Sequence, residues 1–317
     1  MFKKSLLAAA LALAAAGAQA SVVVTIDYDG AGADAAIKTS SLDWSPDSAL
    51  ITPVTPGDSV NSPYVGQLLQ TYVQGTLGSV RNNLGKTVTS PGLNNTYEWT
   101  FVGAFREQVS AISIDPTDPL NGPASLSLQS VTGGTNYFEV WVSAVDSNTL
   151  AGTGYNNGIK ILSGTIDPYN SSTGAGDTKF TSDPKSNVVA LDQANGNNDY
   201  PTLYTTTGSG SGDVNLTIGY IDTNYFTGVS VGDAMTIFLQ TNLGLPFGQV
   251  DPSRLVAGQL AADSSVIGTI NGLNGNSLLL QSDAASNFDL KRIPEPTSVA
   301  LASLGLLGLG LRRRSAK

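Results

Sequence analysis

The chain contains neither cysteine nor histidine among its 317 residues. Without cysteine no disulfide can form, so a packed core must supply the stability of the fold. Without histidine the chain cannot build a Ser-His-Asp or Cys-His catalytic centre or a histidine-containing metal site, and it lacks the usual general base at neutral pH. These two absences exclude the enzymes that rely on a catalytic histidine or on a histidine-containing metal site.

Glutamate is scarce as well, and this bears on glycoside hydrolysis, which needs only two carboxylates beside the sugar bond. Glu98, Glu107 and Glu139 are the only glutamates before the C-terminal tail. Glu98 and Glu139 alternate with apolar residues, so we expect them to face solvent, and we expect Glu107 to form a surface ion pair with Arg106. Because nothing in the sequence selects a carboxylate pair, we expect no catalytic residue and no enzyme.

The N-terminal residues have the three parts of a secretory signal peptide. Lys3 and Lys4 give a positive start, an apolar run follows to residue 17, and Ala18 and Ala20 are the small residues that signal peptidase requires. The run is too short to cross about 30 Å of hydrocarbon. We therefore predict a signal peptide over 1–20, with cleavage before Ser21.

The C-terminal tail has three parts in a fixed order. Pro294, Glu295 and Pro296 form an extended segment, because proline fixes its own φ and disfavours helix in the residue before it. An apolar run then ends at Arg312, Arg313 and Arg314, which stay in the cytoplasm by the positive-inside rule. We predict a processing signal over 291–317. Its short transmembrane helix, 297–311, would be only about 20 Å long and would insert transiently in the inner membrane.

This order of parts resembles the PEP-CTERM sorting domain of Gram-negative bacteria. The resemblance covers about the last 25 residues. It implies that an exosortase recognises and removes the tail, after signal peptidase has removed the N-terminal segment. It also implies that the protein is secreted to the cell surface or the extracellular matrix. A simple C-terminal membrane anchor is the alternative.

The part of the chain between the two signals is strongly acidic. Six of the 16 basic residues lie outside 21–296 but none of the 25 acidic residues does, which leaves ten basic residues and a net charge of −15. Binding nucleic acid through phosphates needs a basic face, so we expect no nucleic-acid partner. The charge favours solubility, divalent cations or cationic partners.

The same part predicts an all-β fold, because short β-branched and aromatic runs alternate with segments rich in Gly, Ser, Thr, Asn and Asp. We expect one secreted domain over 21–290, a β-sandwich with a jelly roll as its specific form. Tyr64–Val80 shows nearly helical spacing but strand-forming residues, and we favour a strand slightly. Strands are further expected at Tyr97–Phe105, Gln108–Ile114, Ser125–Val131, Phe138–Ala144, Gly158–Ile166, Val214–Ile221, Met235–Leu239 and Ser277–Gln281.

The residues from 167 to 213 include segments dense in Asp, Asn and Gly. We expect irregular loops at Asp167–Asn187 and Asp192–Tyr200, and a third that closes at Asp213, because such residues suit turns. Their oxygens are also of the kind that calcium prefers. No EF-hand pattern is present, so we interpret these segments as turns and assign no metal ligand. We expect no cofactor, and bound calcium is the alternative.

The three tryptophans, Trp44, Trp99 and Trp141, are candidate platforms for stacking against sugars, although core packing is the commoner use of this side chain. The sequence around Trp44, from Asp43 to Asp47, predicts a turn. We therefore expect Trp44 to be the exposed one and assign it as a tentative carbohydrate contact.

Several blocks of the body resemble flocculation-associated PEP-CTERM proteins: Ser41–Trp44, Leu68–Val80, and Gly92–Thr100 running into Phe105–Glu107. The resemblance implies a non-enzymatic matrix protein that supports flocculation or biofilm formation by associating with exopolysaccharide. The alternatives are a carbohydrate-binding module without catalysis and, less favoured, a polysaccharide hydrolase.

Overall fold

The computed structural model describes residues 24–32, 36–82, 84–88, 90–118, 122–149, 152–183, 189–190, 204–205, 208–241, 255–256, 259–260 and 276–289. All regular structure in these ranges is β-strand, which confirms the all-β prediction. None of the described residues forms a helix, and so none of them forms one long and apolar enough to cross a membrane.

Eighteen strands follow one another along the described ranges. They are β1 Val24–Asp27, β2 Ala36–Thr39, β3 Ser41–Pro53, β4 Leu68–Arg81, β5 Thr87–Val88, β6 Glu98–Ile114, β7 Ala124–Val131, β8 Tyr137–Ser143, β9 Ile159–Ile166, β10 Asp177–Ser182, β11 Val189–Ala190, β12 Tyr204–Thr205, β13 Gly208–Ile221, β14 Phe226–Thr227, β15 Ala234–Thr241, β16 Leu255–Val256, β17 Gln259–Leu260 and β18 Leu278–Asp289.

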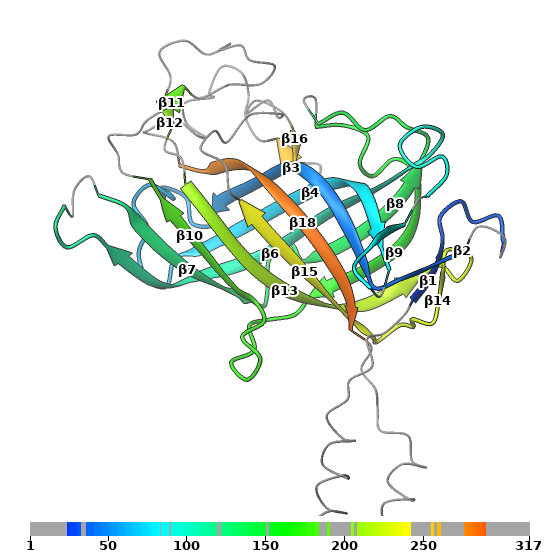
Figure 1. Cartoon of the computed structure of the whole chain (residues 1–317). Helices are drawn as coiled ribbons and strands as arrows, with labels where there is room; N and C mark the ends of the chain where they lie inside the picture. The colour runs from blue at the N-terminus through cyan, green and yellow to red at the C-terminus, as the bar shows by residue number, and fades with distance from the viewer. Residues whose placement is uncertain are drawn as a thin grey trace, which may run out of the picture.

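The main sheet has 11 strands in the order β10-β7-β6-β8-β9-β13-β15-β18-β3-β4-β5. Two further pairings, β4 with β6 and β10 with β13, make it close on itself, and its neighbouring strands are antiparallel (Figure 1). Opposite walls of one continuous sheet therefore face each other across the interior. The jelly-roll form of the predicted sandwich stays a prediction.

The segment Tyr64–Val80, for which the sequence allowed either a helix or a strand, forms the strand β4 from Leu68 onward. β4 pairs with β3 along one edge and with β6 along the other, so its backbone groups are bonded between strands. Gly75 allows this packing, because a Cβ at that position would come within 2.6 Å of the ring of Phe101. Residues 64–67 precede the strand in a turn.

Three segments differ from the predicted pattern. β6 runs without a break through residues 105–108, where we expected two strands, and a register shift lies between Val109 and Ala111. The predicted loop over 167–187 contains β10, and residues 208–213 begin β13 instead of closing a loop. Glycine permits close approach here, because a Cβ on Gly212 would lie 2.1 Å from Thr178 of β10.

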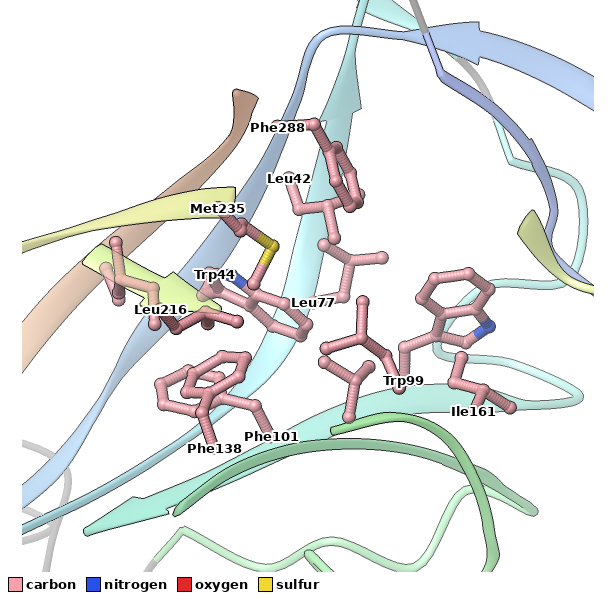
Figure 2. Packing of buried hydrophobic residues seen from close by; sticks show 14 of the residues in the cluster. Leu42, Trp44, Leu77, Trp99, Phe101, Phe138, Ile161, Leu216, Met235 and Phe288 are labelled. Carbon is pink, nitrogen blue, oxygen red and sulfur yellow. The ribbon is translucent and has the colours of Figure 1, made fainter. Parts of the chain in front are cut away.

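The core lies inside the closed sheet. Trp44 meets Phe101 edge to face, and Phe101 stacks on Phe138 at 5.2 Å between ring centroids. Figure 2 shows these rings together with Leu77, Met235 and other apolar side chains that come from strands far apart in sequence. Packing of this kind replaces the disulfides that the chain cannot form.

The two ends of the closed sheet differ. A small sheet of β14, β1 and β2 covers one end, where Val24, Ile26 and Phe226 join the main core and the Trp99 indole N–H donates to the carbonyl of Tyr28 at 3.0 Å. At the other end a smaller apolar cluster forms around Leu69, Val109 and Leu128. No comparable cap of described residues covers this second end.

Candidate functional site

Trp44 is not exposed, contrary to our expectation. It lies in β3 with 2% of its surface accessible, and its indole N–H donates to the Ser286 hydroxyl at 3.0 Å. The residues that predicted a turn form an irregular stretch inside β3, where the register with β4 shifts between Trp44 and Ala49. A buried ring offers no face to a sugar, so Trp44 is a core residue.

Glu98 was expected to face solvent, and it is buried with 1% of its surface accessible. Its carboxylate accepts hydrogen bonds from the backbone N–H groups of Asp146 (3.0 Å) and Ser147 (2.7 Å) and from the Ser147 hydroxyl. Glu98 therefore holds the segment after β8 against the sheet. This is a structural role.

Glu107 was expected to form a surface ion pair, and it lies inside the closed sheet instead. The hydroxyls of Thr71 and Thr178 donate to its two carboxylate oxygens. Burial raises the pKa of Glu107, and these two hydrogen bonds oppose the rise. Arg106 precedes it on the strand and so points to the opposite face.

Asp47 is a third buried carboxylate. The Tyr155 hydroxyl donates to it, as do the Gln74 amide at 3.2 Å and the Thr149 hydroxyl at 3.2 Å. Burial raises the pKa of Asp47, and the hydrogen bonds lower it by less. Glu98, Glu107 and Asp47 are thus all occupied in holding the fold together.

Glu139 is partly exposed and forms an ion pair with Lys160 at 3.0 Å. The Lys160 ammonium also lies 5.5 Å from the ring centre of Trp141, which is a cation–π arrangement. Strand alternation explains the grouping. Phe138, Val140 and Val142 of β8 point into the core, and so Glu139 and Trp141 point outward.

Strand register gathers further aromatic side chains on this outer surface. Tyr137 lies opposite Ala104, which lies opposite Tyr72, so the two tyrosines flank a small buried residue. Glu139 lies opposite Ser163, and Ser163 lies opposite Tyr220, which is 44% exposed. We call this surface the aromatic face, and it consists of Tyr72, Tyr137, Glu139, Trp141, Lys160 and Tyr220.

The aromatic face combines rigid rings with a few polar groups. Burial raises the pKa of the Tyr137 hydroxyl, and Glu139 and Tyr72 raise it further, so this hydroxyl stays protonated and can donate a hydrogen bond at neutral pH. Flat rings can stack on the apolar faces of sugars, while the Glu139 carboxylate, the Lys160 ammonium and the tyrosine hydroxyls can bond sugar hydroxyls. The arrangement can therefore bind a ligand that combines flat apolar faces with hydroxyl groups.

From the sequence we chose Trp44 and not Trp141 as the exposed tryptophan, although the sequence around Trp141 indicated its exposure. The alternation of Phe138, Val140 and Val142 already implied that Trp141 lies on the opposite face of its strand. Tyr72 and Tyr220 could not be found in this way, because only the register between distant strands brings them to this surface.

The remaining predicted site residues lie outside the described residues. These are the signal-cleavage residues Ala18, Ala20 and Ser21, the sorting motif Pro294, Glu295 and Pro296, the arginines 312–314 and the predicted helix over 297–311. The predicted loop Asp192–Tyr200 lies outside as well. Within the described ranges no group of three or more acidic side chains could hold a metal ion.

Comparison with known families identifies the tail. Residues 292–314 match the PEP-CTERM protein-sorting motif. The motif implies that the chain is exported to the cell surface or the extracellular space and that exosortase processes it. No curated protein matches the chain, and no solved structure does either. The resemblance of the body to flocculation-associated proteins therefore stays a prediction.

Proposed function

We propose that the chain is a non-enzymatic matrix protein that binds exopolysaccharide through the aromatic face and so supports flocculation or biofilm formation. The observation that carries the proposal is the grouping of Tyr72, Tyr137, Trp141 and Tyr220 on the outer surface of a closed sheet. Aromatic rings on rigid strands bind with little loss of conformational freedom, because the backbone is already ordered.

The sorting motif supports this proposal, because it implies export to the cell surface or the extracellular space, where an exopolysaccharide would be the partner. We propose that signal peptidase first cleaves before Ser21. The C-terminal helix then holds the chain briefly in the inner membrane of a Gram-negative bacterium until exosortase releases the domain over 21–290. No cofactor takes part in this scheme.

The state of the carboxylates favours binding over hydrolysis. A glycosidase needs one acid and one base or nucleophile beside the same bond. Glu98, Glu107 and Asp47 are buried and engaged by several donors, and Glu139 is paired with Lys160. We therefore place Glu139 in the binding surface and assign no catalytic role.

Co-sedimentation tests the binding role. The protein secreted by the producing strain is mixed with exopolysaccharide isolated from the same culture, and the bound fraction is measured against polymer concentration. We expect Trp141→Ala to weaken binding at least fivefold, because the loss of one aromatic ring that stacks on a ligand costs about 1–3 kcal/mol where nucleic-acid bases are the ligand.

Phe238→Ala is the matched control. Phe238 is also an exposed aromatic residue, at 43% accessibility, but it lies on β15 and outside the aromatic face. Equal binding by the wild-type protein and Trp141→Ala would refute the proposal, and so would equal losses in the two variants.

A carbohydrate-binding module for a defined oligosaccharide is the second candidate, favoured by the directional polar groups of Glu139 and Lys160. Saturable binding of a short oligosaccharide, lost in Trp141→Ala, would select it. Binding that requires long polymer would favour the matrix role.

A further inference from the structure

An apolar cavity of about 380 Å³ lies at the end of the closed sheet that the small sheet does not cover. Inward-facing residues of several strands line it, among them Ile51, Leu69, Leu128 and Phe180. It reaches the surface beside Ile114, which is 50% exposed. Its volume falls within the range of small-molecule sites, which is roughly 300–1,000 Å³.

The described lining of this cavity contains no charged side chain. Its polar members include Asn61, Ser62 and Ser182 near the surface, and Gln67, which is fully buried. A lining of this kind disfavours a charged ligand, because the ligand would lose its hydration without gaining a counter-charge.

Gln67 carries an unused acceptor. Its side-chain N–H donates to the carbonyl of Ser59 at 3.2 Å, which fixes the orientation of the amide, while Oε1 is buried and has no hydrogen-bond partner among the described residues. Its backbone is also held, since its carbonyl accepts from the N–H of Val109 at 2.9 Å. A buried acceptor without a donor is destabilising, so a ligand that donates to it gains affinity.

A second, smaller cavity of about 70 Å³ adjoins the first, and the two share Ile51, Leu128 and Phe180. Glu107 lines this inner cavity with both carboxylate oxygens engaged by threonine hydroxyls. Among the described residues, packing is therefore incomplete from the open end inward as far as Glu107. By contrast, the capped end is filled by Trp99 and Phe226.

We propose that this cavity binds a neutral, mostly apolar small molecule whose single hydroxyl or N–H group donates a hydrogen bond to Oε1 of Gln67. The site lies inside the sheet and is distinct from the aromatic face, so it does not depend on polysaccharide binding. The apolar lining also excludes a sugar, whose many hydroxyls would remain without partners.

A fluorescent probe of this chemistry gives a direct test. N-Phenyl-1-naphthylamine is neutral and apolar and has one N–H donor, whereas its N-methyl derivative has the same rings and no donor. With the full-length protein we expect saturable binding of one probe per chain. We expect about fivefold tighter binding of the N–H compound, the usual effect of one hydrogen bond. 1-Dodecanol should displace the probe, and dodecanoate should do so at least tenfold less well.

Two variants locate the site. Ala124→Phe adds a ring in the cavity and should abolish binding, whereas Leu84→Phe, at a position that is 75% exposed, should leave it unchanged. Gln67→Leu should remove the fivefold preference for the N–H compound and leave the N-methyl compound bound as before. If Gln67 had only a structural role, the substitution would weaken the binding of both compounds equally.

Three results would overturn the proposal. They are the absence of saturable probe binding, binding unaffected by Ala124→Phe, and equal affinity of the wild-type protein for the two probes. The comparison of the two probes on the wild-type protein keeps the test decisive if a variant fails to fold.

Discussion

At the scale of single residues, the buried carboxylates of Glu98 and Glu107 join separate segments of the chain through hydrogen bonds. In the sequence Glu98 lies in an alternating pattern typical of an exposed strand position, and Glu107 follows Arg106 as in a surface ion pair. Their partners come from residues distant in sequence, such as Ser147 for Glu98 and Thr178 for Glu107. A local pattern cannot show that another segment covers a side chain, and so the sequence alone could not predict these roles.

The raised pKa of Glu107 predicts a pH dependence of stability. Because burial raises the pKa in the folded state above the ordinary value of 4.5, Glu107 contributes stability that is full below pH 4.5 and is lost as pH rises through the folded-state pKa. Glutamine cannot ionise, so in Glu107→Gln this part of the loss of stability with rising pH should disappear. Urea unfolding between pH 4 and pH 8 measures it.

Glu139→Gln is the control, because Glu139 is partly exposed and its ion pair with Lys160 contributes about 1 kcal/mol at most. If Glu107→Gln and the wild-type protein lost stability with pH to the same extent, Glu107 would not be the buried group that the structure shows.

At the scale of elements, strands with an apolar inner face were predictable, and strands made of glycine, serine and threonine were not. β8, β9 and β15 agree with prediction to within a few residues, because each one alternates or carries β-branched residues. β10 and the first half of β13 pair with each other, and few of their side chains are large and apolar. Only the partner strand identifies them as strands.

Close strand packing predicts a large difference between two neighbouring glycines. A Cβ on Gly164 of β9 would lie 2.4 Å from the carbonyl oxygen of Thr217 in β13, whereas a Cβ on Gly219 would find its nearest atom at 3.8 Å. Gly164→Ala should therefore lower the free energy of unfolding by about 1–3 kcal/mol.

Gly219→Ala is the matched control and should change stability by less than about 0.5 kcal/mol. Chemical denaturation of both variants provides the measurement. Equal stability of the two would show that β9 and β13 do not pack in the register described here.

At the scale of the whole molecule, the tail was recognisable from sequence because its three parts occur in one order at one end. The match at residues 292–314 confirms the sorting motif. The aromatic face was not recognisable, because it depends on register among β4, β6, β8, β9 and β13. Sorting information is thus local in the sequence, and the proposed binding surface is not.

Processing gives a prediction at this scale. Replacing Pro294, Glu295 and Pro296 by alanine should remove the segment that exosortase recognises, so the protein should keep its tail and remain with the membrane fraction. Intact-mass measurement of the secreted and membrane-bound protein detects this. Release of a normally processed protein from the variant would contradict the assignment of the motif.

Floc formation is the decisive measurement, because in the proposed role it needs both export of the protein and binding through the aromatic face. A strain deleted for this gene is complemented with the wild-type chain, with Trp141→Ala or with Phe238→Ala, and the settling of cells is measured at equal levels of secreted protein. We expect the wild-type chain and Phe238→Ala to restore settling and Trp141→Ala to leave it impaired. Settling that is unchanged by the deletion, or fully restored by Trp141→Ala, would contradict it.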